Sequence, residues 1–358
     1  MRISTSLLSL PLLASAVIGV PKFVPEKTSS LDTPLGRSLP ALYDLRQPLL
    51  SSSDNGDGSW WTSTYLKASN HSNYLLISHV TIAAGAGCYR ASLLDLDTLS
   101  LYKQFYQPVV GVLTSDVGLL NISIPSQYGF QAQGAEGLPT FRTWAENDAF
   151  SYDVTFKPTS PILYNGGVGG FMWGPGMTYQ FSIPSAVTTG TLKIGKSGEV
   201  LTIDKDNSFT WLDRQWGGGI PITGNFTWFQ LHFGGTKVSL WATDSKIPYQ
   251  KSRFATIRHE DGSLDVRAIE LVSDYSAPYK STRVPGLEYA TAWNVKFLGP
   301  EGGELRIAIA TRDQEIVGSI GLVSSYTGYI TATGTFWGKA VEGFGATEII
   351  DLAKAMVV

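Results

Sequence analysis

The chain has 358 residues, of which 43% are hydrophobic and 16% charged, and its formal net charge is −3 at pH 7. This composition predicts a folded protein with a well-filled core and excludes a disordered chain. The slight negative charge and the lack of a basic run argue against nucleic acid as a partner. Cys88 is the only cysteine, so an internal disulfide is impossible.

The first residues have the pattern of a secretory signal peptide. Arg2 precedes an apolar run at residues 7–13, and Ala14-Ser15-Ala16 matches a small-residue cleavage site. We expect residues 1–16 to be removed and the chain to enter the secretory pathway and be secreted; a buried N-terminal strand is the alternative. No later stretch has the length of a membrane span, so we expect no stable membrane insertion.

Three Asn-x-Ser/Thr sequons follow, at Asn70, Asn121 and Asn225. In a secreted chain such triplets are acceptors for N-glycosylation. Combined with the signal peptide, they predict a glycoprotein.

The remaining chain is typical of β structure. Alternating patterns rich in β-branched and aromatic residues predict strands at residues 73–82, 190–204, 226–243 and 329–341. Turn signals such as Gly234-Gly235 and Asp261-Gly262 separate such runs, and helical periodicity is scarce. We predict an all-β sandwich or barrel protein. Because this is too much β structure for one small barrel, we divide the mature chain into domains at residues 17–205 and 206–358.

Residues 209–219, FTWLDRQWGGG, place an acid among tryptophans. Alternation along a strand divides them into two faces, with Phe209, Trp211, Asp213 and Gln215 on one and Thr210, Leu212, Arg214 and Trp216 on the other. If the first face lines a cavity, desolvation raises the pKa of Asp213 and makes it a proton donor near neutral pH. The aromatic rings beside it would stabilise a carbocation by cation–π attraction. The alternative is a structural role, as a turn cap or in an ion pair with an arginine.

A second predicted strand also combines aromatic and polar side chains on one face, namely Phe226, Trp228, Gln230 and His232. His232 either relays a proton or orients a substrate hydroxyl, or it is a hydrogen-bonded core residue. Glu348 is either a second acid–base group or a partner for Arg214. The four histidines are scattered and no HExxH motif occurs, so we expect no metal site.

Two motifs resemble those of a known superfamily. WLDRQWG at residues 211–217 resembles the W/Y-x-D-[HR]-[QN]-W-G signature of the hydroxyneurosporene synthase and AttH-like group, and FWGKAVEGFGATEI resembles its closing pattern. The early SWWTSTYL and YRASLLDLD segments resemble its fungal secreted branch, which includes kievitone hydratase. The similarity covers most of the mature chain. It implies two lipocalin-like antiparallel β-barrel domains packed side by side, with a ligand cavity in or between them.

The resemblance also implies an activity. Members act on prenyl or isoprenoid groups without a cofactor, which implies an enzyme of fungal secondary metabolism with a hydrophobic small-molecule substrate. Asp213 matches the general acid that protonates an alkene or epoxide, and hydration, cyclisation or rearrangement follows. Arg214 stands where bacterial members usually carry histidine. We expect catalytic roles for Asp213, Glu348 and His232, and substrate contacts from Trp211, Trp216, Trp228, Phe209, Gln230 and Arg214.

Two other functions remain open. A pericyclase of the Diels–Alderase type would fold a polyene into a reactive conformer and need no acid. A secreted lipocalin-like carrier would bind a hydrophobic metabolite and return it unchanged.

Overall fold

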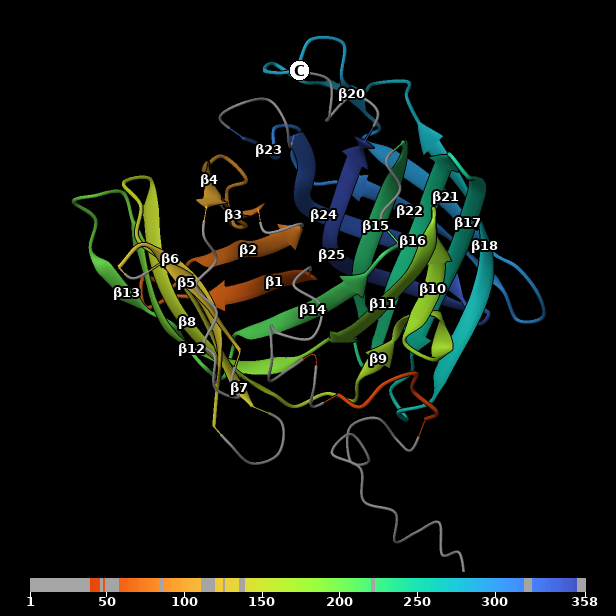
Figure 1. Cartoon of the computed structure of the whole chain (residues 1–358), viewed down its shortest axis with the longest axis horizontal. Coiled ribbons are helices and arrows are strands. Elements are labelled where there is room, and N and C mark those ends of the chain that lie inside the picture. The colour runs from red at the N-terminus through yellow and green to blue at the C-terminus, as the bar shows by residue number, and fades with distance from the viewer. Residues whose placement is uncertain are drawn as a thin grey trace, which may run out of the picture. The chain divides into compact units, whose positions relative to one another are not determined.

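The computed structural model describes residues 39–45, 48, 58–83, 86–110, 120–124, 126–134, 139–219, 223–318 and 324–352. The predicted signal peptide lies outside the described residues. Within them nearly all regular structure is β, with one short 3-10 turn at Asn165–Gly167, so the predicted all-β fold is confirmed (Figure 1). None of the helical residues described forms a segment with the length and hydropathy needed to cross a membrane.

The first sheet is curled and antiparallel. Its main path runs through β4 (Tyr102–Val110), β3 (Ala86–Asp95), β2 (Asn73–Ala83), β1 (Gly58–Lys67), β14 (Phe209–Gly217), β12 (Ala186–Ile194), β8 (Phe150–Pro158), β7 (Thr140–Ala145), β6 (Tyr128–Gln133) and β5 (Asn121–Ile124). Four further strands attach to it, namely β9 (Leu163–Tyr164), β10 (Gly170–Trp173), β11 (Gly176–Ile183) and β13 (Val200–Thr202). Its concave face holds a core that includes Trp60, Tyr89, Phe141, Leu212 and Trp216.

The second sheet closes into a barrel. Its strands are β22 (Gly303–Ile309), β21 (Ala292–Phe297), β18 (Leu264–Asp274), β17 (Tyr249–Arg258), β16 (Thr236–Lys246), β15 (Gly224–Phe233), β25 (Lys339–Asp351), β24 (Ser324–Phe336) and β23 (Glu315–Val317). Pairing of β22 with β24 joins the first of these strands to the eighth. Phe229, Leu240, Trp293 and Ile330 fill the barrel interior. A separate two-stranded piece pairs β19 (Tyr279–Lys280) with β20 (Glu288–Tyr289).

The chain passes from the first sheet to the second between β14 and β15, not at residue 205. The expected boundary assigned residues 209–217 to the C-terminal domain, whereas β14 pairs with β1 and β11 of the first sheet. A strand belongs to the sheet that supplies its hydrogen bonds, and β1 lies far earlier in the sequence. The division into two folding domains stays a prediction.

A third cluster of aromatic residues joins the two sheets. Trp61, Tyr65 and Trp211 come from the first sheet, while Phe226, Trp228 and Trp241 come from the second. Because side chains alternate along a strand, β1 points Trp60 into the first core and Trp61 toward the barrel. In Figure 1, β1 and β14 lie beside β25 and β15 in the middle of the view. This interface between the sheets contains the candidate catalytic residues.

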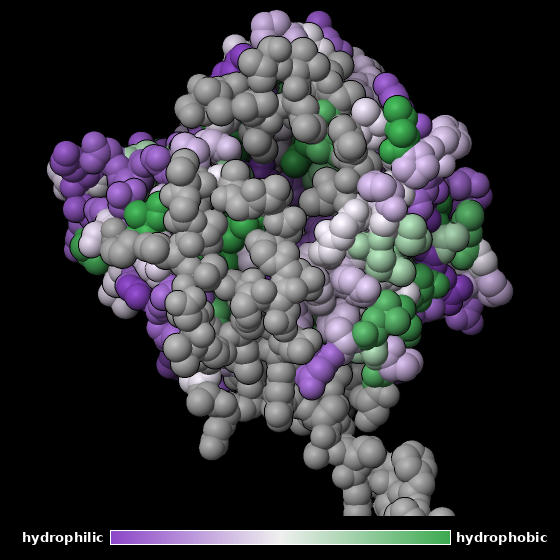
Figure 2. Space-filling model, viewed as in Figure 1, coloured by the Kyte–Doolittle hydropathy of each residue, from purple (hydrophilic) through white to green (hydrophobic). Residues whose placement is uncertain are grey.

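The outer surface carries no comparable aromatic cluster among the described residues. Figure 2 shows hydrophobic residues in small groups among hydrophilic ones on the viewed face. Burying a large apolar side chain stabilises a fold by roughly 1.5–3 kcal/mol, so the tryptophans between the sheets contribute substantially to holding them together.

Candidate active site

Asp213 is a buried acid on the face of β14 that points toward the barrel. It is 5% exposed, and the side chains of Ser182 and Gln180 on β11 donate hydrogen bonds to its two carboxyl oxygens. Burial raises the pKa of Asp213 from 3.8 to about 7, against the opposing effect of these hydrogen bonds, and the charge of Glu348 raises it slightly further. Near neutral pH both protonation states are therefore populated, so Asp213 can donate or accept a proton.

Asp213 stands at one end of a row of side chains that crosses four strands. Asp213 on β14 pairs with Trp61 on β1, Trp61 pairs with His79 on β2, and His79 pairs with Arg90 on β3. Directly paired residues of antiparallel strands project from the same face of a sheet. All four side chains therefore face the barrel, and the rings of Trp61 and His79 lie 5.2 Å apart.

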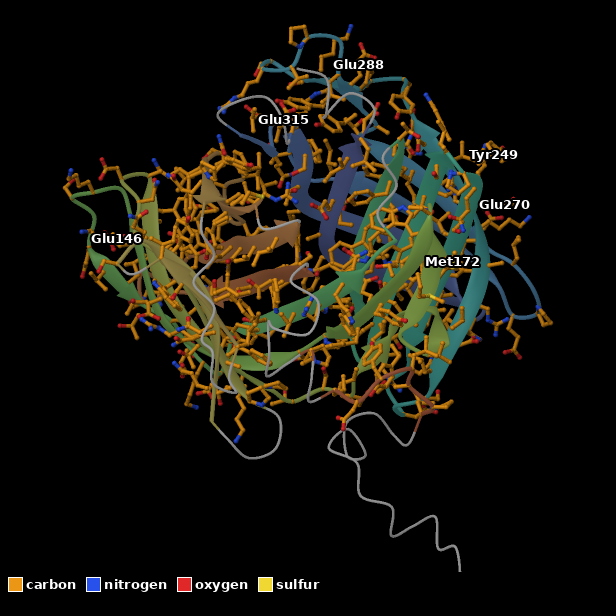
Figure 3. All side chains as sticks on the ribbon, viewed as in Figure 1. Glu146, Met172, Tyr249, Glu270, Glu288 and Glu315 are labelled. Atoms are coloured by element: carbon orange, nitrogen blue, oxygen red, sulfur yellow. The ribbon has the colours of Figure 1, made fainter. Side chains whose placement is uncertain are left out.

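A facing row lies on the barrel. Trp228 on β15 pairs with Glu348 on β25 and with Trp241 on β16. The Trp228 and Trp61 rings meet edge to face with their centroids 5.6 Å apart, so the two rows touch. In Figure 3, side chains from both sheets project into the middle of the view. Asp213 and Glu348 thus lie on opposite walls of one aromatic interface.

Arg90 connects the rows. Its guanidinium donates hydrogen bonds to Glu348 Oε1 and Ser325 Oγ on the barrel, and it donates to His79 Nδ1 over 2.8 and 3.0 Å. Burial raises the pKa of Glu348, and the positive charge of Arg90 counteracts this shift. The alternative that Glu348 pairs with Arg214 is wrong, because Arg90 is its partner. Arg90 lies in the YRASLLDLD segment, but nothing in that segment points to a partner 258 positions away, so sequence reasoning gave it no role.

His79 is a neutral acceptor in this arrangement. Its Nδ1 accepts from Arg90, while its Nε2 lies 2.7 Å from Ser59 Oγ and 2.9 Å from Thr81 Oγ1. Burial, and secondly the charge of Arg90, lower its pKa well below 6.5. These contacts assign the ring hydrogen to Nε2, and they aim Nδ1 at the guanidinium.

His232 lies in an aromatic cage at the same interface. Its ring centroid is 5.1–5.4 Å from those of Tyr65, Phe209, Trp211 and Phe344. Neither ring nitrogen has a hydrogen-bond partner among the described residues, and burial lowers its pKa well below 6.5. The imidazole is therefore neutral, and both nitrogens are available to a bound molecule.

Gln230 lies next to His232 on the same face of β15. Its amide nitrogen donates to Ser63 Oγ and, over 3.2 Å, to Tyr65 Oη, while its Oε1 has no partner in the described part of the chain. The structure therefore brings Phe209, Trp211, Trp228, Gln230 and His232 together. Their contact with substrate stays a prediction.

Arg214 and Trp216 lie on the opposite face of β14. The guanidinium of Arg214 is 4.0 Å from the Trp60 ring and 5.0 Å from the Trp216 ring, and Trp216 belongs to the first core. Alternation along β14 separates both side chains from Asp213. Both side chains pack in the first sheet and lie outside the cluster around Asp213, and their contact with substrate stays a prediction.

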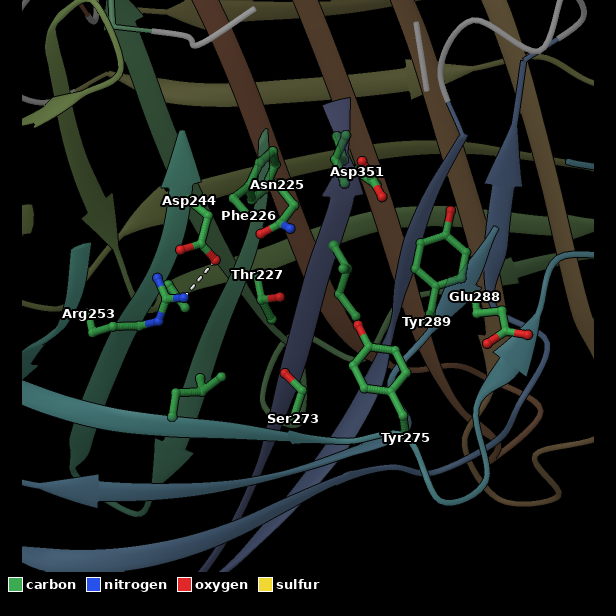
Figure 4. Close-up of a pocket in the computed structure, with 14 residues that line it drawn as sticks. Asn225, Phe226, Thr227, Asp244, Arg253, Ser273, Tyr275, Glu288, Tyr289 and Asp351 are labelled. Carbon is green, nitrogen blue, oxygen red and sulfur yellow. Dashed lines mark hydrogen bonds and ion pairs between the residues drawn. The ribbon is translucent and has the colours of Figure 1, made fainter. Parts of the chain in front are cut away.

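The barrel has a separate cavity of about 190 Å³ (Figure 4). Asn225, Asp244 and Arg253 line it, and Arg253 pairs with Asp244 over 2.7 Å. None of the three candidate catalytic residues lines this cavity.

Of the sequons, Asn70 and Asn225 are exposed and Asn121 is partly buried, and their glycosylation stays a prediction. No group of three or more His, Cys, Asp or Glu residues in the described ranges is placed to hold a metal ion.

Comparisons with known proteins agree with this architecture. The AttH-like family model matches residues 108–350. Kievitone hydratase of Fusarium solani subsp. phaseoli is 35% identical over 332 residues, which is 92% of each chain. Dehydratase asqC of Emericella nidulans is 32% identical over 339 residues, covering 92% of this chain and 94% of the relative. The crystal structure of kievitone hydratase from Nectria haematococca has a TM-score of 0.80 at 32% identity, with 90% of this chain and 96% of that chain covered. This match confirms the predicted double lipocalin-like fold, here one closed barrel and one curled half-barrel.

Proposed function

Because this chain belongs to the AttH-like family and is an enzyme of the hydratase and dehydratase type, we propose that it adds water to, or removes water from, a prenylated small molecule bound between its two sheets. The aromatic interface supports a hydrophobic substrate, since it presents five tryptophans from both sheets. Kievitone, which the name of one relative specifies, is the first compound to test. Both relatives come from fungi, which supports a place in fungal secondary metabolism, and the leader pattern supports secretion.

A single observation carries the mechanism: Asp213 is a buried acid whose pKa is raised to about 7, and it stands beside the rings of Trp61 and Trp211. In hydration the π electrons of the prenyl double bond take the proton of Asp213 and leave a tertiary cation. A lone pair of water then forms the C–O bond, and one proton of that water leaves. A positioned general acid contributes about 10²–10⁴-fold, and each aromatic face stabilises a cation by about 0.5–2 kcal/mol.

Dehydration runs the same steps in reverse: the hydroxyl takes up a proton and leaves as water, and the carboxylate of Asp213 then removes a proton from the carbon next to the cation. If an internal hydroxyl captures the cation in place of water, the product is cyclised and has the mass of the substrate. Mass spectrometry therefore separates these outcomes.

The experiment compares wild type, Asp213→Asn and Asp206→Asn with kievitone as substrate. Asp206 is an exposed aspartate in a turn before β14 and is the matched control. We expect wild type and Asp206→Asn to form a product heavier by one water, and Asp213→Asn to be at least about 100-fold slower. The wild-type rate should fall about tenfold per pH unit above pH 7, because the acid then loses its proton.

An Asp213→Asn variant that keeps the wild-type rate would refute acid catalysis by Asp213. If the product of both proteins also had the mass of the substrate, the result would favour a pericyclase. Tight binding of kievitone with no chemical change in wild type would favour a carrier.

A further inference from the structure

Glu348 is held in an unsymmetrical way. Arg90 donates to its Oε1, whereas no described side chain donates to its Oε2, and the side chain is 10% exposed. Burying an ion pair costs several kcal/mol per charge unless hydrogen bonds satisfy both partners. Arg90 meets this requirement through His79 and Ser325, and Glu348 does so with one oxygen only. One carboxylate oxygen therefore remains available at the aromatic interface.

The two acids differ in what surrounds them. Asp213 is contacted by the neutral groups of Gln180 and Ser182, while Glu348 is contacted by a guanidinium. Neutral surroundings favour the protonated form of a buried carboxyl, and a cation favours the ionised form. Two carboxyl groups whose environments differ in this way are suited to opposite roles, one as acid and one as base.

The distance between Asp213 and Glu348 matches the length of one double bond and one water molecule placed in line between them. Asp213 and His79 lie two strands apart in the first sheet, which places them about 10 Å apart at the usual spacing between strands. Glu348 Oε1 is 3.9 Å from His79 Nδ1, so it lies near that end of the row. Two near-attack contacts of about 3 Å, one double bond and one water–carboxylate hydrogen bond of about 2.7 Å span roughly the same distance.

We propose that Glu348, oriented by Arg90, binds the reacting water and takes its proton, while Asp213 protonates the alkene from the opposite wall. This assignment deepens the proposed function and rests on it. In hydration the Asp213 proton forms the new C–H bond, and water forms the C–O bond. The second water proton passes to Glu348 and then through solvent back to Asp213, so one alkene and one water give one alcohol.

The structure makes Arg90 and His79 positioning residues. Arg90 holds Glu348 as a carboxylate, and His79 holds Arg90 through the lone pair on Nδ1. Neither contributes a proton to the reaction, because Arg90 stays charged and His79 stays neutral at working pH.

The test separates protonation from water capture by running the reaction with kievitone in D₂O. Glu348→Gln keeps the size of the side chain but removes the base, and Glu342→Gln on the exposed part of β25 is the matched control. We expect Glu348→Gln to slow hydration at least about 100-fold. Recovered kievitone should nevertheless gain carbon-bound deuterium, because Asp213 still protonates the alkene and the cation reverts. Asp213→Asn should abolish both hydration and deuterium uptake.

Hydration by Glu348→Gln at the rate of Glu342→Gln would overturn the assignment and leave the role of Asp213 intact. Loss of both readouts in a folded Glu348→Gln protein would also overturn it, since Glu348 would then not act on water alone. If Glu348→Gln does not fold, Glu348→Asp keeps the charge and moves it by one methylene; slower hydration with deuterium uptake retained is expected there. A wild-type protein inert toward kievitone and other prenylated phenols would refute the proposed function and this assignment with it.

Discussion

The raised pKa of Asp213 makes a prediction about stability that needs no substrate. A carboxyl whose pKa is higher in the folded protein than in the unfolded chain holds its proton more tightly when folded. Its contribution to the free energy of unfolding therefore decreases as the pH rises from the unfolded value of 3.8 to the folded value of about 7. Asp213 is 5% exposed, so solvent screens this effect little.

The shift sets the size of the effect. The difference between 3.8 and about 7 corresponds to about 4 kcal/mol in the contribution of Asp213 to the free energy of unfolding. Roughly 2.5 kcal/mol of this contribution is lost between pH 5 and pH 8. Asp213→Asn removes the titrating group and retains the shape of the side chain. The amide of Gln180 can rotate to accept from the new Asn, since its Oε1 has no partner among the described residues. We therefore expect the free energy of unfolding of the variant, relative to that of wild type, to increase by about 2.5 kcal/mol between pH 5 and pH 8.

Urea unfolding of both proteins at pH 5 and pH 8 measures this change. Taking the difference between the two proteins at each pH cancels the other titrating groups, which they share. A difference that stays constant within about 0.5 kcal/mol between pH 5 and pH 8 would show that Asp213 has an ordinary pKa, and the argument for a buried proton donor would fail.

Two other substitutions test the interface. Arg90→Met leaves Glu348 buried without its cation and should lower the free energy of unfolding by about 3–5 kcal/mol. Adding Glu348→Leu to this variant should restore most of the lost stability. If the single and double variants are equally unstable in urea, the ion pair is contradicted. His232→Phe suits the surrounding rings and removes two buried nitrogens that have no partner in the described residues, so it should leave stability unchanged or raise it by about 1 kcal/mol. The same variant should bind kievitone more weakly, and an unchanged KM would remove His232 from the binding site.

Local patterns in the sequence were enough to predict much of this protein. Alternation assigned Trp211 and Asp213 to one face of β14, and Trp228, Gln230 and His232 to one face of β15, and the structure has them so. The motif around Asp213 indicated the family and the double lipocalin-like fold. Such features depend on the period of two along a strand and on short contiguous motifs, which the sequence contains directly.

The partners across the interface were decided only by tertiary structure. Arg90 and Glu348 meet because β3 and β25 face each other across two sheets, and no sequence spacing relates them. The same holds for Trp61, whose register places it between Asp213 and His79. Arg214 shows the converse, since it is adjacent to Asp213 in sequence and yet lies on the other face of the strand. Strand register and sheet packing join residues that are distant in the chain, and these long-range pairings determine which of the two acids keeps its proton.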